Sequence, residues 1–265
     1  MQLRKLEPSF RERVWGRHSL EPWFNARAEP AKIPLGEVWF ETPEVPLLIK
    51  FLFTTENLSV QVHPDDAYAR VHHNSPGKTE MWHVLEAEPA AKIAAGFRDP
   101  VTREQARAAA LDGHIVDLLQ WFDAGPGDTF FIPAGTVHAI GGGLTICEIQ
   151  QPSDITYRFY DYGRGRELHL DRALEVSQLG PHAARSPGKV ASPYFVMEPV
   201  EVAGALTLAP LAANSGDEIL IVIAGEGQIG SEQARAGEVW HLGVDQYPIE
   251  ITGNIRLLRA FVPPR

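Results

Sequence analysis

The chain has 265 residues, of which 44% are hydrophobic and 22% charged; this is an ordinary globular composition, with enough residues for one large β domain or two small ones. The formal net charge of −10 argues against a nucleic-acid partner, because affinity for nucleic acid comes mainly from basic side chains on phosphates. No apolar run approaches the ~20 residues of a membrane helix, and the first residues lack a secretory signal, so we expect a cytoplasmic protein with no membrane partner.

Short apolar runs punctuated by 21 prolines and 23 glycines predict a mostly β protein. In chain order, the expected strands are residues 47–53, 58–63, 80–85, 92–96, 129–132 and 144–149. A short helix is expected after residue 66, and residues 102–105 match a capping box that opens a helical stretch reaching to about Trp121, in which Gly113 separates two short helices. The number and spacing of the strands predict an all-β sandwich or barrel with a small helical insertion near residues 98–121.

The strand expected over residues 58–63 carries polar side chains, although its neighbours indicate a buried position. Alternation puts Ser59, Gln61 and His63 on one face. The neighbouring apolar run 47–53, interrupted only by Lys50, indicates a central part of a sheet. Polar side chains in such a position need partners, and a metal ion would be one.

A second motif provides another histidine. The spacing Gly-x5-Pro-x-Gly-x2-His that ends at His138 is that of the second cupin motif, in which a turn and a Pro-x-Gly corner direct a histidine into a barrel. The first cupin motif normally offers two histidines followed by a glutamate, and here Gln61, His63 and Glu80 fill those places. An amide oxygen, two imidazoles and a carboxylate suit Zn²⁺, with a position left for water or substrate.

Two lobes are expected, forming a double cupin of β-sandwich or jelly-roll type. Residues 180–193 are rich in Pro, Gly, Ser and Ala and lack an apolar rhythm, so they are interpreted as a linker. The Gly-acid turn and strand at 127–132 have an echo at 237–242, a register that places Pro248 opposite His138. We therefore expect a catalytic, metal-binding lobe over residues 1–179 and a second, ligand-less lobe over residues 194–265.

The first lobe resembles the type I mannose-6-phosphate isomerases. The agreement runs in order through residues 14–16, 48–52, 58–66, 77–82 and 132–139. The resemblance implies a sugar-phosphate substrate, interconversion of mannose 6-phosphate and fructose 6-phosphate, and zinc. The implied zinc ligands are Gln61, His63, Glu80 and His138, and the implied functional residues are Lys50, Lys78, Asp154 and Arg158.

The chemistry of an aldose-ketose isomerase gives these residues roles. A proton moves between adjacent carbons through an enediol, which requires a base, an oxyanion stabiliser and a phosphate anchor. Lys78 is expected to donate to a sugar oxygen and the planar guanidinium of Arg158 to hold an anion. Asp154 would orient Arg158 or exchange protons, and Lys50 and Ser59 would contact the substrate. The base itself is not identified by the sequence.

Other interpretations stay open at this point. A non-catalytic, metal-bearing sugar-phosphate sensor could use the same fold, although Lys78 and Arg158 favour catalysis. An iron cupin oxygenase is disfavoured by Gln61 and by the absence of the usual His-x-His. Arg158 could also form only a structural ion pair with Asp154 or Asp161. The lone Cys147 excludes an intrachain disulfide and, within an apolar run, is expected to be a core residue and not a nucleophile.

Overall fold

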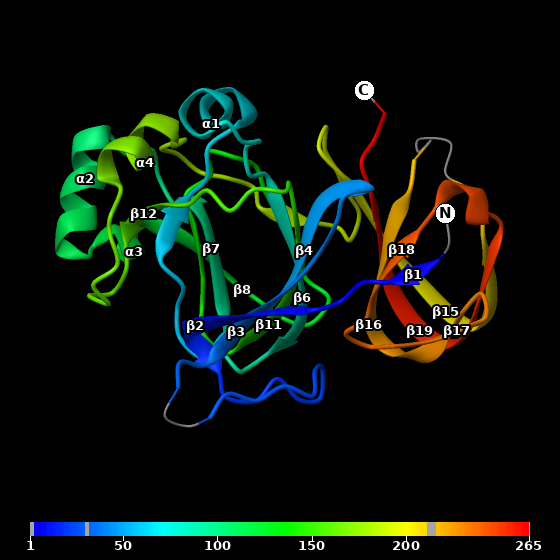
Figure 1. Cartoon of the computed structure of the whole chain (residues 1–265). Coiled ribbons are helices and arrows are strands. Elements are labelled where there is room, and N and C mark those ends of the chain that lie inside the picture. The colour runs from blue at the N-terminus through cyan, green and yellow to red at the C-terminus, as the bar shows by residue number, and fades with distance from the viewer. Residues whose placement is uncertain (1–2, 30–31, 211–215, 265) are drawn as a thin grey trace.

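The computed structural model describes residues 3–29, 32–210 and 216–264 of the chain (Figure 1). Its strands are β1 (Arg4–Lys5), β2 (Ser9–Arg17), β3 (Leu35–Thr42), β4 (Val45–Phe53), β5 (Val60–Val62), β6 (Glu80–Ala87), β7 (Lys92–Phe97), β8 (Leu119–Asp123), β9 (Thr129–Ile132), β10 (His138–Ile140), β11 (Leu144–Gln150), β12 (Tyr157–Tyr160), β13 (Arg185–Ser186), β14 (Val190–Ala191), β15 (Val196–Leu208), β16 (Glu218–Ile229), β17 (Glu232–Arg235), β18 (Val239–Leu242) and β19 (Ile249–Phe261). Its helices are α1 (Asp66–His73), α2 (Arg103–Asp112), α3 (Ile115–Leu118), α4 (Leu170–Val176) and the 3₁₀-helix η1 (Val244–Gln246). The expected all-β class is confirmed.

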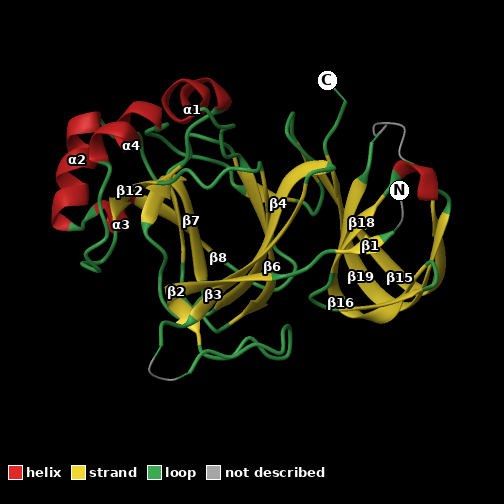
Figure 2. Cartoon of the chain, in the orientation of Figure 1, coloured by secondary structure: helices red, strands yellow, loops and turns green. Residues whose placement is uncertain are grey.

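Three antiparallel sheets organise the chain. Two of them, with strand orders β13-β9-β6-β11-β4-β3-β2 and β12-β5-β10-β7-β8, make up what we call the first lobe. The third, ordered β1-β18-β16-β19-β15-β14 with β17 beside β16, is the second lobe. Figure 2 shows α2, α3 and α4 on the side of the first lobe that lies away from the second, with α1 at the top of the first lobe in this view. An apolar cluster fills the space between the two sheets of the first lobe, and a further cluster lies beneath the helices.

Local signals account for the helix ends. Asp65 caps α1, since its side chain accepts from the backbone N–H of Tyr68, and α1 ends at Asn74 in the left-handed conformation. The predicted capping box at the start of α2 is present, and Gly113 with φ of 87° ends that helix. The expectation that helix reaches to residue 121 is wrong, because α3 ends at 118 and the chain then pairs with β7 as strand β8. Tertiary pairing overrides the local pattern there.

The strand expected over residues 58–63 is also shorter, and only Val60–Val62 form β5. Pro64 follows directly and has no N–H to continue the ladder. Ser59 and His63 therefore flank the strand.

Strand alternation explains the long apolar runs of the central sheet. On β4, Ile49 and Phe51 belong to a buried cluster that also contains Ile221 and Leu258 of the second lobe. Lys50, on the opposite face, lines a cavity inside the first lobe. Both faces of this sheet are thus covered, which is why its strands read as continuous apolar runs. Cys147, fully buried in the same interlobe cluster, is a core residue as expected.

Short pairings connect the lobes. The stretch 180–193 contains β13, which pairs with β9 of the first lobe, and β14, which pairs with β15 of the second. β1 pairs with β18, so residues 4–5 lie in the sheet of the second lobe although the expected boundary assigns them to the first. The chain therefore begins in the sheet of the second lobe, continues through the first lobe and returns to the second.

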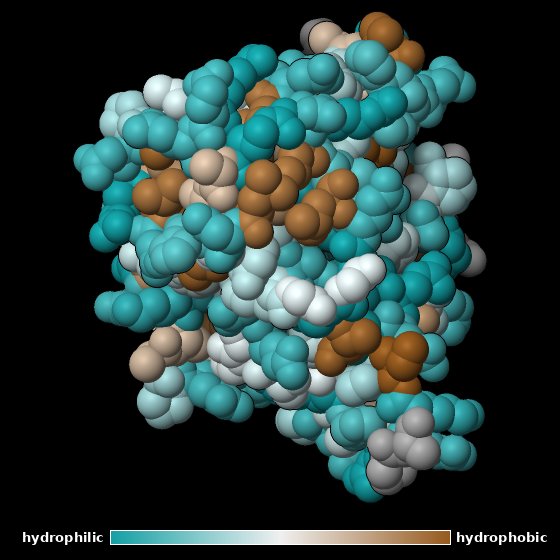
Figure 3. All heavy atoms as spheres, turned by 90° about the vertical axis from the view of Figure 1, so that its left-hand side faces the viewer, coloured by the Kyte–Doolittle hydropathy of each residue, from teal (hydrophilic) through white to brown (hydrophobic). Residues whose placement is uncertain are grey.

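The outer surface of the helical side is mostly hydrophilic, with scattered apolar patches (Figure 3). Val71 on α1 and Leu111 on α2 are exposed there. Among the described residues, none of the helices has the length and apolar content needed to cross a membrane.

Candidate metal centre

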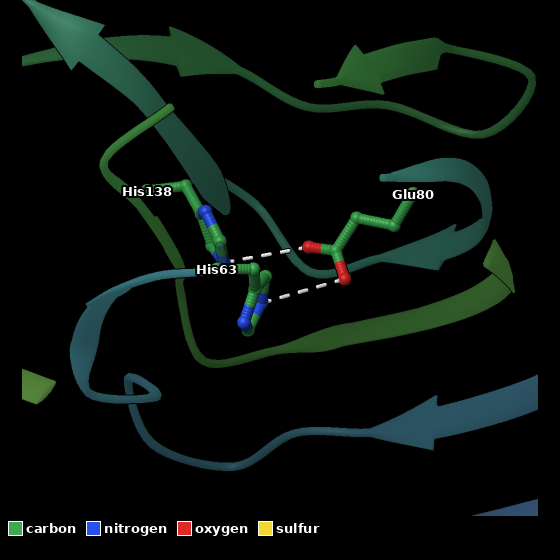
Figure 4. Close-up of side chains that lie close together, drawn as sticks. All are labelled: His63, Glu80 and His138. Atoms are coloured by element: carbon green, nitrogen blue, oxygen red, sulfur yellow. Dashed lines mark ion pairs between the residues drawn. The ribbon is translucent and has the colours of Figure 1, made fainter. Parts of the chain in front are cut away.

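Three side chains that could hold a metal ion meet inside the first lobe. His63 follows β5, Glu80 opens β6 and His138 opens β10, and each is 1% exposed. Their nearest ligand atoms all lie within 4.8 Å of one another. His63 Nε2 is 3.6 Å from Glu80 Oε2 and His138 Nε2 is 3.3 Å from Glu80 Oε1, so the two rings approach the two carboxylate oxygens (Figure 4).

Backbone carbonyls orient both imidazoles. His63 Nδ1 lies 2.8 Å from the carbonyl oxygen of Ile155, and His138 Nδ1 lies 2.9 Å from that of Thr136. A carbonyl can only accept, so each Nδ1 carries the proton and each Nε2 is left unprotonated, with a lone pair that can accept a hydrogen bond or bind a metal ion. This is the orientation that metal-binding histidines take from their outer partners.

The electrostatics favour the forms that bind a cation. Burial lowers the pKa of His138 to about 3, and burial together with the adjacent Lys78 ammonium lowers the pKa of His63. Burial alone would raise the pKa of Glu80, but the positive charge of Lys78 beside it and the two histidines hold that pKa well below its usual value. The cluster therefore presents two neutral imidazoles and one carboxylate, as metal binding requires.

The carboxylate of Glu80 has unused capacity. Lys78 Nζ lies 2.7 Å from Oε2 and 3.0 Å from His63 Nε2, yet within the described part of the chain neither oxygen of Glu80 accepts a hydrogen bond of good geometry. A buried carboxylate is costly unless it is paired or coordinates a metal. The residues present thus fit a divalent cation.

Gln61 adjoins this cluster. Its backbone pairs with His138 across β5 and β10, and its Nε2 lies 3.3 Å from His138 Nε2. Its Oε1 accepts a hydrogen bond of 2.9 Å from the Ser59 hydroxyl. The other residues expected at the site line one cavity next to the cluster, namely Lys50, Ser59, Lys78, Asp154 and Arg158. The structure thus brings all nine expected site residues together.

Asp154 and Arg158 occupy different surroundings in this cavity. Asp154 Oδ1 lies 3.4 Å from Lys50 Nζ, so its charge partner is Lys50. The Nε of Arg158 is buried and has no hydrogen-bond partner among the described residues. Asp161, a possible structural partner of Arg158, instead pairs with Arg166 at 2.5 Å. The cavity therefore contains a guanidinium with unused donors.

Sequence reasoning missed two buried acids of this cavity, Glu37 and Glu148. Glu148 pairs in register with Lys50 on one side and Trp82 on the other. Its carboxylate lies 3.5 Å from Lys50 Nζ and accepts a hydrogen bond of 2.9 Å from Trp82 Nε1. Burial, with the nearby negative Glu80, raises its pKa to about 6. The available signal was that Glu148 interrupts an apolar strand, just as Lys50 does.

Two facing β sheets around a buried His-Glu-His cluster define a cupin-type protein with a candidate metal centre. No family model matches the chain. The mannose-6-phosphate isomerase of Streptococcus mutans is 36% identical over 229 residues, covering 76% of this chain and 71% of that protein. ManA, the mannose-6-phosphate isomerase of Bacillus subtilis, is 36% identical over 212 residues, covering 65% and 67%.

A solved structure agrees over nearly the whole chain. The crystal structure of the mannose 6-phosphate isomerase from Bacillus subtilis superposes with a TM-score of 0.84 at 27% identity, covering 97% of this chain and 99% of that one. The chain belongs to the mannose-6-phosphate isomerase family, and it is an enzyme of that family.

Proposed function

We propose that the chain interconverts mannose 6-phosphate and fructose 6-phosphate with a zinc ion held by Gln61, His63, Glu80 and His138. The observation that carries this proposal is the convergence of two Nε2 lone pairs and a buried carboxylate that, among the described residues, accepts no hydrogen bond of good geometry. Gln61 would offer its amide oxygen after rotation of the amide group, since its nitrogen now faces His138. Nitrogen and oxygen donors in this combination suit Zn²⁺.

The residues around the cluster fit the demands of the reaction. Polarisation of the substrate oxygens is the chemistry that a bound zinc would supply. The proton leaves carbon 2 of the aldose and returns to carbon 1 of the ketose, while negative charge develops on the oxygens of the enediol. Lys78 and Arg158 stabilise that charge, because both present donors beside the cavity. Lys50 and Ser59 contact the substrate, and Asp154 holds Lys50 in place through their ion pair.

The division of labour between the lobes is part of the proposal. Residues 1–179 would supply the catalytic lobe with its helical insertion, and residues 194–265 a structural lobe without ligands. The support is the interlobe apolar cluster, which covers the back of the catalytic sheet. We further propose that the enzyme works in the cytoplasm, in keeping with its single, buried cysteine.

Solvent deuterium tests the proposal directly. Zinc-loaded protein in deuterated water should place deuterium at carbon 1 of fructose 6-phosphate and carbon 2 of mannose 6-phosphate, read by NMR alongside a coupled assay of conversion. A chelator should abolish both signals and added zinc should restore them. A sugar-phosphate sensor would bind the ligand but show neither conversion nor exchange, and that result would refute the isomerase assignment.

A further inference from the structure

The segment that presents Lys78 to the cluster lies between α1 and β6, outside any helix or strand. Three successive backbone amides of residues 77–79 are nevertheless held by hydrogen bonds. The first donates to Asp66 Oδ1 at 2.8 Å, the second to the Pro64 carbonyl at 3.0 Å and the third to Gln151 Oε1 at 2.8 Å. The segment is thus fixed from α1 on one side and from the end of β11 on the other.

Asp66 and Gln151 are also bonded to each other. Gln151 Nε2 donates to Asp66 Oδ1 at 2.8 Å, and the backbone N–H of Gln151 donates to the Thr79 carbonyl at 3.1 Å. Gln151 is 6% exposed and Thr79 is 2% exposed. Loss of the Gln151 side chain would leave the buried N–H of Thr79 without a partner, which is costly. The hydroxyl of Thr79 in turn accepts from the backbone N–H of Ala134, in the corner that leads to His138.

Close packing limits the same segment. A Cβ on Gly77 would lie 2.5 Å from the carbonyl carbon of Asp65 and 2.6 Å from the amide nitrogen of Asp66. The backbone of residue 77 therefore sits directly against the start of α1. The Lys78 side chain is buried, with 4% of its surface exposed, so it has little room to compensate for a shift of its backbone. Here the ammonium arrives 2.7 Å from Glu80 Oε2.

We propose that Asp66 and Gln151 are positioning residues that hold Lys78 and Glu80 in the positions that catalysis requires. Neither is among the residues of the metal cluster or of the cavity beside it. They act through the backbone of residues 77–79. The inference rests on the proposed catalytic role of Lys78. Misplacement of a catalytic group by about 1 Å can cost a large factor in rate.

Kinetics of four single variants test the idea. Asp66→Ala and Gln151→Met should lower kcat by about 10-fold or more with a smaller change in KM, and with zinc still bound. Asp66→Asn keeps an acceptor oxygen in the same place, so it should restore most of the activity. Asp65→Ala is the matched control, because it removes the cap of α1 without touching residues 77–79. Equal losses in Asp65→Ala and Asp66→Ala would assign the effect to the helix and overturn the proposal.

A second readout does not depend on turnover. Lys78 is 4% exposed, so it should react slowly with acetic anhydride in the native protein, as measured by peptide mass spectrometry. Asp66→Ala and Gln151→Met should raise this reactivity several-fold, and Asp65→Ala and Asp66→Asn should not. If the reactivity changes as expected while the wild type fails to isomerise, the positioning role stands and the proposed function falls. If isomerisation is found and neither kcat nor Lys78 reactivity changes, the positioning role is refuted.

Discussion

The two lobes use the same turn but treat buried charge differently. Gly127 leads into β9 and Gly237 leads into β18, with φ values of 91° and 90°, which confirms the local likeness of the two segments. In the second lobe, Arg259 binds Glu218 through Nη2 and Oε1 at 2.8 Å and also bonds to the Tyr247 hydroxyl at 2.7 Å. Nε of Arg259 bonds to Oε2 of Glu218 as well, so both carboxylate oxygens of this buried acid have a partner.

In the first lobe, some buried charged groups have atoms without a hydrogen-bond partner. The oxygens of Glu80 and the Nε of Arg158 lack hydrogen-bond partners within the described residues, and they lie at or beside one cavity. The second lobe instead has an apolar interior, filled by side chains such as Val222, Ile255 and Leu257. A buried ion pair with full hydrogen bonding is a structural device, whereas buried polar atoms beside a cavity that keep free hydrogen-bonding capacity, as in Glu80 and Arg158, are suited to a ligand. The two lobes therefore differ in the side chains of the site and not in the kind of fold.

The largest expected effect comes from the histidines. His138→Ala should lose zinc and nearly all activity, because one of the two fixed Nε2 donors disappears. His241, buried in the second lobe against Asp217 at 2.8 Å, provides the control: His241→Ala should keep stoichiometric zinc. Elemental analysis of the purified proteins decides between them. Unchanged metal content in the His138 variant would show that the cluster is not the metal site.

A contrast between two arginines sharpens the comparison. Arg158→Ala should remain folded and keep zinc, yet lose about 100-fold in kcat, the typical effect of removing one preorganised donor. Arg259→Ala should instead lose stability, by about 3 kcal/mol or more, since it leaves Glu218 charged and buried. Assays with folded protein and urea unfolding curves separate the two effects. A large loss of stability in the Arg158 variant would make that residue structural as well.

Acid should weaken the protein through its buried neutral histidines. Burial lowers the pKa of His83 to about 4, with Arg256 of the second lobe adding to the effect. The unfolded chain takes up the proton near the ordinary histidine pKa of about 6.5. Stability is therefore full above that pH and falls as the pH drops toward 4, by roughly 3 kcal/mol for this one side chain.

The change His83→Gln isolates that contribution, because a glutamine does not titrate. Urea midpoints measured at pH 7.5 and 4.5 should differ less in this variant than in the wild type. His63 and His138, whose pKa values are also lowered by burial, keep part of the acid sensitivity in both proteins. An equal difference in variant and wild type would show that His83 does not contribute.

Local spacing was sufficient to find the candidate ligands. Alternation along a strand has a period of two residues, and it put Gln61 and His63 on one face before any tertiary contact was known. The turn and the corner before His138 lie within a dozen residues of it, so their geometry is also set by local sequence. The capping box and the C-terminal Gly113 of α2 belong to the same class of short-range signal.

Partners far apart in the chain could not be found this way. Arg158 was one of the partners considered for Asp154, but the folded chain brings Asp154 to Lys50, 104 residues away. The same holds for the bond between Asp66 and Gln151, which spans 85 residues. Each strand could pair in several registers that satisfy its own alternation, and only the packing of all sheets selects one.

The sequence by itself therefore determined the all-β class, the cupin-type motifs and the side chains that converge as donors, because these depend on backbone geometry over a few residues. Only the tertiary structure decided which charges are paired and which are left for a ligand. It also decided that the sheet containing β4 is buried against the second lobe on one face, by residues such as Phe51 and Leu258. The physical reason is that burial and pairing depend on sheets formed between distant segments, and no local pattern records which segment will cover another.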